Sequence, residues 1–465
     1  MQLPLECLEN TFGFLGNHLP TLYDCTQVSH TWRRATIRQL YRNPWASLAL
    51  PRYGKYSGCD ELQVKQLVRT LLASNGSTLS KEESDFIQYS DNESQLNYLS
   101  VLRVFDFRFM APWHGDFSLT AGDKVTRKLW KLVREQCSSV LEKLVFVEML
   151  SLTEVFPLGV SYPSLKSVCL HIEDLELSHA MMIARACSNI RELRIRAHYI
   201  EDAAIAKIIS AQAPQQLKEL FLVCDRGIRS INGTIDALIQ HHRFSCRELR
   251  FGFQSCGLFF TQANKEAISR ISELPNLRVL ELSCCRCVDD ECISEIANKC
   301  TLLEEIDLSS TSVTATGVTN LVERLGANLK RIILSQNSNN VIENVLPIIS
   351  KHCPQLQHLD IRGLPYTLLE LKTILNCSKL NTLVLGNCRE PSTNSTEEML
   401  CQLISESRSL HSIEFGRVAV TEKVVQAVAN HKQLQIVKLN LNTLKLTQAT
   451  AELMINPKTV QFTPF

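Results

Sequence analysis

Leucine-like residues recur along most of the chain at the first, fourth and sixth positions of short segments. Thirteen such segments begin between Leu102 and Leu434, about 26 residues apart. Apolar residues at the fourth and sixth positions, with a residue between them on the other face, predict a short strand with one buried face. The segments, each written as its three apolar residues, are Leu102-Phe105-Phe107, Leu141-Leu144-Phe146, Leu165-Val168-Leu170, Ile190-Leu193-Ile195, Leu217-Leu220-Leu222, Cys246-Leu249-Phe251, Leu277-Leu280-Leu282, Leu303-Ile306-Leu308, Leu329-Ile332-Leu334, Leu356-Leu359-Ile361, Leu380-Leu383-Leu385, Leu410-Ile413-Phe415 and Leu434-Val437-Leu439.

Between these strands the apolar period changes to that of a helix. In the stretch after Thr314, apolar residues fall at i, i+3, i+4 and i+7, and Thr314 and Thr396 stand where a helix N-cap is expected. A strand and a helix every 26 residues or so cannot bury their apolar faces alone, so neighbouring units must stack. The sequence therefore predicts an α/β solenoid of about 13 repeats over residues 99–465, with a curved parallel sheet inside and helices outside.

The placement of cysteine and asparagine gives this pattern a more specific resemblance. A cysteine stands three residues before the first apolar position in several repeats, and a cysteine or asparagine stands three residues after the last one in others. The first group is Cys187, Cys300, Cys353 and Cys377, with Cys137 four residues before, and the second is Cys285, Cys388, Asn337 and Asn442. The pattern resembles the cysteine-containing subclass of leucine-rich repeats, in which these residues satisfy backbone groups of the turn.

The first 46 residues have a different character. Helical spacing places Leu8, Phe12 and Leu15 on one stripe, and Leu22, Cys25, Val28 and Trp32 on another. So small a set of amphipathic helices buries little apolar area and should expose a patch that needs a partner. The alternative is a helical cap over the open end of the repeat core, and one segment can serve both purposes.

The order of residues in this segment resembles the F-box, a helical module that binds the Skp adaptor of cullin–RING ubiquitin ligases. It is most similar to the fungal variant, which ends in Leu-Tyr-Arg-x-Pro-Trp, here Leu40 to Trp45. The resemblance implies an adaptor contact formed by the residues at the matching positions, with Trp32 packing the helices. The residues for the contact are Leu3, Pro4, Leu8, Phe12, Leu15 and Val28.

Residues 47–98 separate the F-box-like segment from the repeats. Glu61–Leu72 is predicted as an amphipathic helix, and the polar stretch of about residues 74–93 as a mobile surface segment of this connector. The first repeat is long, with 39 residues between Leu102 and Leu141. We expect Ala111–Gly115 within it to form a surface loop in an atypical capping repeat.

Composition excludes several classes of protein. The net charge is +1 and charged residues make up 21%, so no basic field favours nucleic acid. No run of apolar residues approaches the 18 needed for a membrane span, and the start Met-Gln-Leu-Pro-Leu-Glu lacks the features of a secretory leader. We expect a cytoplasmic or nuclear protein whose 18 cysteines are mostly buried and reduced.

The sequence offers no usable catalytic or metal-binding motif. The densest thiol cluster is Cys284-Cys285-x-Cys287 with Cys292 and Cys300, but it lacks paired CxxC spacing, and the repeat phase already explains Cys285 and Cys300. A phosphate loop, a nucleophile elbow and a carboxylate pair for two metals are also missing. We expect no catalytic residue, no metal and no cofactor.

The outward row of the predicted sheet, between the fourth and sixth positions, points to a partner surface. Arg194, Phe221 and Arg250 come from successive repeats, beside Glu281 and Asp307 in the next two. Arginine and aromatic residues are enriched where interfaces concentrate their binding energy. We expect this band to bind an extended or acidic segment of a target protein. The alternative is neutralisation of the arginines by the flanking Glu192, Glu219 and Glu248 of their own sheet.

Together the two resemblances imply a substrate receptor of an SCF-type ubiquitin ligase. The F-box would hold a Skp-type adaptor and, through it, cullin and RING subunits, while the repeats hold a protein substrate whose identity the sequence does not give. Two alternatives stay open. One is a repeat scaffold that binds the adaptor without degradation of a target, and the other is a receptor that senses a small molecule.

Overall fold

A computed structural model describes most of the chain and divides it into two compact units. The first unit comprises residues 1–198 and 207–217, and the second comprises residues 199–206 and 218–465. The expected positions Leu3, Asn337 and Asn442 lie outside the described residues. The described ranges are 4–15, 18–48, 61–74, 79–87, 97–113, 120–226, 228–253, 262–335, 344–388, 394–416, 420–440 and 459–463.

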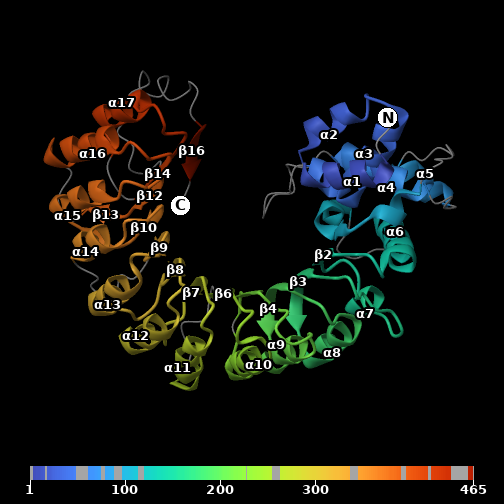
Figure 1. Ribbon diagram of the computed structural model, residues 1–465, viewed down its shortest axis with the longest axis horizontal. Coiled ribbons are helices and arrows are strands. Elements are labelled where there is room, and N and C mark those ends of the chain that lie inside the picture. The colour runs from blue at the N-terminus through green and yellow to red at the C-terminus, as the bar shows by residue number, and fades with distance from the viewer. Residues whose placement is uncertain are drawn as a thin grey trace. The chain divides into compact units, whose positions relative to one another are not determined.

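The first unit begins with helices and continues into a parallel sheet (Figure 1). Strands β1, β2 and β3 pair in register, with Phe105 opposite Leu144 and Leu144 opposite Val168. The elements are α1 Leu5–Phe14, α2 Leu19–Cys25, α3 His30–Arg42, α4 Glu61–Ala73, α5 Lys81–Ile87, β1 Val104–Asp106, α6 Ala121–Cys137, β2 Lys143–Val147, α7 Leu152–Val155, β3 Ser167–Leu175, α8 Leu177–Ala186 and β4 Glu192–Ile200, with short 3-10 helices at Pro44–Ser47, Tyr98–Val101, Phe107–Phe109 and Ala111–Trp113.

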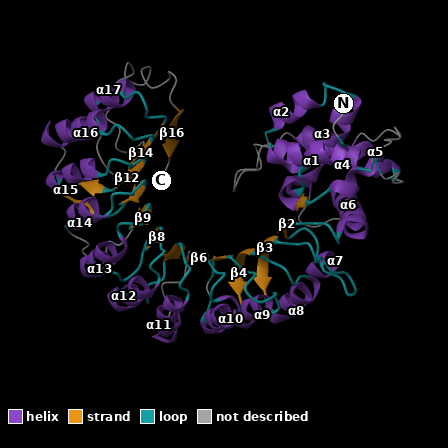
Figure 2. Cartoon of the chain, viewed as in Figure 1, coloured by secondary structure: helices purple, strands orange, loops and turns teal. Residues whose placement is uncertain are grey.

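The second unit continues the alternation of strand and helix, as Figure 2 shows. Its strands pair parallel in chain order, and the fourth-position residues face one another across each pair, for example Leu249 opposite Leu280. The elements are α9 Asp202–Ser210, β5 Glu219–Cys224, α10 Asn232–His242, β6 Glu248–Phe253, α11 Gln262–Ser269, β7 Val279–Ser283, α12 Asp290–Lys299, β8 Glu305–Asp307, α13 Ala315–Leu325, β9 Arg331–Ile333, α14 Val345–His352, β10 His358–Asp360, β11 Pro365–Tyr366, α15 Leu368–Thr373, β12 Thr382–Leu385, β13 Asn387–Cys388, α16 Asn394–Glu406, β14 Ser412–Phe415, α17 Glu422–Asn430, β15 Ile436–Asn440 and β16 Thr459–Thr463, with 3-10 helices at Arg270–Glu273 and Ile374–Asn376.

The repeat pattern read from the sequence is the core of both units. Every one of the apolar repeat positions is at most 5% exposed, apart from Leu439, whose side chain is not described. Burial of a leucine side chain stabilises a fold by about 1.5–3 kcal/mol, so the repeated triplets supply most of the driving force for stacking. The fold is the leucine-rich-repeat solenoid that the sequence predicts, with parallel strands on one layer and helices on the other.

Two helix starts were predicted, and one is correct. Thr314 caps α13, since its hydroxyl accepts the backbone N–H of Thr316 at 3.2 Å. The second, at Thr396, is wrong, because α16 already begins at Asn394. None of the helices within the described ranges is long and apolar enough to cross a membrane.

The connector and the long first repeat contain more helix than expected. Residues 81–87, predicted as mobile, form α5, and Lys124 of α6 lies 2.7 Å from Glu82. Ala111–Trp113, predicted as a surface loop, is a 3-10 helix whose Trp113 is buried. Gly122 makes this packing possible, since a Cβ there would lie 2.6 Å from the Trp113 Cβ. Much of the added length of the first repeat is the 17-residue helix α6.

Candidate protein-binding surfaces

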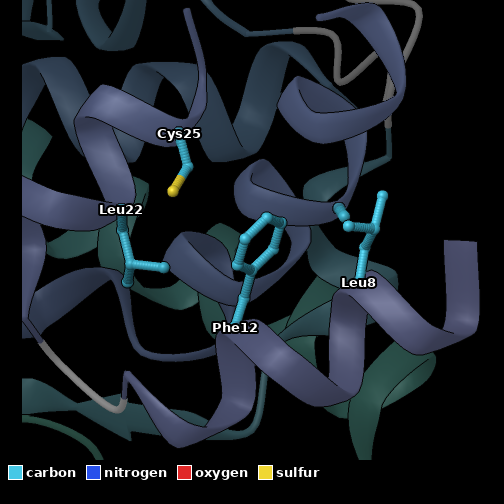
Figure 3. Packing of buried hydrophobic residues seen from close by; sticks show 5 residues of the cluster. Leu8, Phe12, Leu22 and Cys25 are labelled. Carbon is cyan, nitrogen blue, oxygen red and sulfur yellow. The ribbon is translucent and has the colours of Figure 1, made fainter. Parts of the chain in front are cut away.

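The N-terminal helices α1, α2 and α3 enclose a small core of their own. Five residues form it, and Phe12 meets the ring of Trp32 edge to face with centroids 5.2 Å apart. Figure 3 shows four of the five, Leu8, Phe12, Leu22 and Cys25, and the fifth is Ala35. An ion pair of 2.7 Å between Arg38 of α3 and Glu9 of α1 adds a link at the surface. Trp32 therefore packs the helices together, as the resemblance implies.

The residues expected at the adaptor contact divide into two groups in this core. Leu8 and Phe12 are each 2% exposed, so they hold the helices together and cannot touch a partner in this conformation. Their expected direct contact is thereby corrected to a structural role, because the stripe that we took as an outer face is the inner one. Leu15 and Trp32 are half-buried, and Pro4 and Val28 are exposed.

The same helices expose large apolar side chains that the sequence did not single out. Phe14 is 93% exposed and Tyr23 is 66% exposed, and Val28 is 61% exposed. Exposed aromatic groups on so small a module are typical of a binding surface. Phe14 lies two residues after the buried Phe12, a spacing that places it off the inner stripe of α1. That spacing was the available signal.

The end of the helical module is fixed to the first repeat. The Trp45 indole donates a 3.0 Å hydrogen bond to the Val104 carbonyl of β1, and its ring packs edge to face on Phe105. Tyr41 stacks on Tyr98 at 4.0 Å between ring centroids. This junction shows that the segment also caps the repeat core, which is the alternative role named above.

The outward row of the second unit has the register that the sequence predicts. Phe221 lies opposite Arg250, Arg250 opposite Glu281, and Glu281 opposite Asp307. Arg194 is exposed on β4 of the first unit and is treated with that unit.

The charges of this row are largely paired within the sheet. Arg250 binds the carboxylate of Glu281 and, at 3.1 Å, that of Glu248. Burial raises the pKa of Glu281, and Arg250 opposes that shift. Burial also raises the pKa of Asp307, which accepts the backbone N–H of Ser309 at 2.8 Å. Neutralisation by the sheet itself, the alternative for the arginines, therefore holds for Arg250.

The same self-pairing continues toward the C-terminus. Arg362 donates to Asp360 at 2.6 Å and reaches Glu414 at 3.1 Å, and Lys438 lies 3.5 Å from the other oxygen of Glu414. Because Val384 separates Asp360 from Glu414 in the row, the Arg362 side chain bridges across one strand. This part of the face is a closed network of ion pairs.

The repeat cysteines lie inside the fold as thiols. Cys137 donates to the Leu99 carbonyl at 2.9 Å, and Cys300 to the Leu274 carbonyl at 3.4 Å. Burial raises the pKa of each of these two thiols to about 12, so both stay protonated. They satisfy carbonyls of the preceding turn, the structural role that the resemblance implies. Within the described ranges, no three His, Cys, Asp or Glu side chains are grouped to hold a metal ion.

Comparison with known proteins gives a partial relationship. The chain is 30% identical over 141 residues to F-box/LRR-repeat protein 4 of Bos taurus, a match that covers 30% of this chain and 22% of the relative. The chain thus spans about a fifth of the length of that relative. No model of a known protein family matches the sequence.

Two solved structures share part of the arrangement. An internalin from Listeria monocytogenes aligns with a TM-score of 0.39 and 14% identity, over 72% of this chain and 84% of that one. The yeast complex of Rad7 and Elc1 aligns with a TM-score of 0.48 and 15% identity, over 73% of this chain and 87% of the matched chain.

Proposed function

We propose that this protein is the substrate-recognition subunit of an SCF-type cullin–RING ubiquitin ligase. Helices α1–α3 act as an F-box of the fungal type and bind a Skp-type adaptor, through which cullin and RING subunits join. The repeats, of the cysteine-containing subclass, hold the target protein. Ubiquitin transfer is performed by other subunits, and this chain supplies proximity and specificity without a catalytic residue of its own.

The observation that carries the proposal is the exposed apolar surface of a closed helical module. The core of α1–α3 is complete, yet Phe14, Tyr23 and Val28 remain in solvent. Apolar side chains that the module does not need for its own core are available for a partner. The partial similarity to an F-box/LRR-repeat protein supports the same function.

The junction at Trp45 supports a role in positioning. Hydrogen bonding to Val104 and packing on Phe105 and Phe109 fix the end of the module on β1. A receptor that presents a bound target to a distant transfer site gains from a defined orientation, because proximity is what it contributes.

Adaptor binding tests the proposal through the exposed residues. We expect Phe14→Glu with Val28→Glu to abolish co-purification with a co-expressed Skp-type adaptor while the melting temperature stays unchanged. The matched control is Leu158→Glu with Leu369→Glu, two leucines of the repeats that are 79% and 78% exposed. Adaptor binding that survives in the first variant, or is lost in the control, contradicts the proposal.

A second measurement separates ligase from scaffold. Proteins that co-purify with the Phe14→Glu, Val28→Glu variant should accumulate in cells that express it, because they are held but not ubiquitylated. If the same proteins bind but keep their normal abundance and turnover, the chain is a scaffold. Truncation of the first 46 residues is a poor substitute, because it removes Trp45 from the repeat core.

A further inference from the structure

Two neighbouring rows of side chains cross the sheet of the first unit. In the lower row, Asp106 lies opposite Val145 and Val145 opposite Cys169, and in the upper row Val147 lies opposite His171. The backbone N–H of Glu192 binds the Lys166 carbonyl just as that of Ser167 binds the Glu142 carbonyl, so the same register continues onto β4. The two rows are Asp106, Val145, Cys169 and Arg194, and Arg108, Val147, His171 and Arg196.

These two rows are rich in guanidinium groups. They contain Arg108, Arg194 and Arg196 against the single carboxylate of Asp106, which takes both nitrogens of the Arg108 fork at 2.6–3.2 Å. Glu173 and Glu192 lie on the same strands but outside the rows. Row for row, the arginines outnumber the acids here.

Histidine at the centre of the rows reports the positive field. His171 lies 3.3 Å from the Cys169 thiol through its Nε2 atom. Burial, together with the positive charges of Arg108 and Arg196, lowers the pKa of His171 to about 4. The ring is therefore neutral at pH 7, and the local potential favours anions.

Between the arginines the surface is apolar and low. Val145 is buried beneath the rows, Val147 is half-buried, and both lie on β2 between Arg108 and the arginines of β4. A floor of short side chains, edged by long cationic ones, suits an extended chain with acidic side chains at its margins. Arginine forks bind carboxylates with two parallel hydrogen bonds.

The corresponding face of the second unit has a different balance. Arg250, Arg362 and Lys438 each pair with a carboxylate of the same sheet. An incoming acidic segment there would have to displace carboxylates already in place, which offsets its gain.

We propose that the two rows on β1–β4 form the site that binds an acidic, extended peptide segment of the target protein. Arg194 and Arg196 hold the carboxylates, and Val145 and Val147 lie under the backbone of the segment. This inference rests on the proposed function only in assuming a protein target for the repeats. It places the recognition site on the first unit, whereas the sequence pointed to a band from Arg194 to Asp307.

Binding of a defined peptide tests the site directly. The probe is a fluorescent peptide of about ten residues with alternating glutamate and small apolar residues, measured by anisotropy on the full chain bound to its adaptor. Arg194→Gln with Arg196→Gln should weaken binding about tenfold or more. The matched control is Arg185→Gln, an exposed arginine on α8, which should bind as the intact protein does. Affinity of the intact protein should also fall as salt is raised.

The outcomes decide between supporting and overturning the site. Equal binding by the Arg194→Gln, Arg196→Gln variant and the control, or equal binding of a glutamine-substituted peptide, overturns it. A peptide with phosphoserine in place of glutamate separates the two anion sources, and binding of that peptide alone also overturns the carboxylate proposal. Adaptor binding is unaffected by these substitutions, so failure here is distinct from failure of the proposed function.

Discussion

The Trp45 indole reaches across from the helical module and donates its N–H to the Val104 carbonyl at 3.0 Å, on the first strand of the repeats. The ring is 3% exposed and stacks on Phe109 with centroids 5.6 Å apart. One side chain thus ends the F-box-like segment and begins the core of the repeats. Folding of the two parts is coupled through it, because neither surface is covered without the other.

We expect Trp45→Ala to lower the free energy of unfolding of the first unit by about 3–5 kcal/mol, because a large aromatic side chain leaves a cavity beside Phe105. Trp45→Phe keeps most of the packing and loses the hydrogen bond, at a cost of about 1 kcal/mol. Urea unfolding measures both. Equal losses in the two variants would mean that the indole N–H, and not the packing, holds the junction.

Leu8 provides a contrast with the exposed residues of the same module. Leu8→Ala should cost about 2–5 kcal/mol, because the side chain is buried between the helices. Adaptor binding should weaken with it, in parallel with lost helical protection in hydrogen exchange. Phe14→Glu should abolish adaptor binding with protection intact. A Leu8→Ala variant that loses adaptor binding at full stability would return Leu8 to the contact surface.

Periodicity predicted the repeats well because the same physical demand recurs in each one. Leu280, Ile306 and Ile332 must enter one shared core, so their spacing records the strand register directly. The outward row followed from the same phase, and its pairing from Phe221 to Lys438 is confirmed strand by strand in the second unit.

Other features depend on contacts that spacing does not encode. A stripe of Leu8, Phe12 and Leu15 identifies an apolar face, but only packing tells whether that face is inward or outward. The charge state of the outward row has the same difficulty, since Arg250 is neutralised by Glu281 from another strand. Helix α6 was missed because it falls within the long first step, where the repeat phase is broken.

Asp290 joins consecutive repeats at their helix starts. Its carboxylate accepts the backbone N–H of Thr314 at 2.7 Å and the Thr314 hydroxyl at 2.5 Å, and a Cβ on Gly317 would fall on its Oδ1 atom and 2.9 Å from Val313 Cγ1. We expect Asp290→Ala to cost about 1–2 kcal/mol, from the loss of these bonds. Gly317→Ala should cost about 1–3 kcal/mol by crowding, although alanine favours helix.

The double variant then tests whether the two residues share one site. With Asp290 already removed, Gly317→Ala should cost less than it does alone, because only Val313 still crowds the new methyl group. The sum of the single effects should exceed the effect of the pair by about 0.5 kcal/mol or more in urea unfolding. Strict additivity would show that Gly317 is crowded by Val313 alone.

His358 makes the stability of the second unit depend on pH. Burial and the charges of Arg331 and Arg362 lower its pKa from 6.5 to about 4, while Asp360 opposes the shift. Between these two values the unfolded chain binds the proton that the folded chain does not, so stability is present above pH 6.5 and falls as the pH drops toward 4.

His358→Gln removes this proton-linked term from one strand of the sheet. We expect the variant to lose about 1–2 kcal/mol less than the intact protein between pH 7 and pH 4.5, measured as free energies of urea unfolding. The slope should shrink without vanishing, because His171 of the first unit has its pKa lowered to about 4 as well. A constant difference between the two proteins at every pH would show that His358 contributes only packing, and that the charges of Arg331 and Arg362 do not reach its ring.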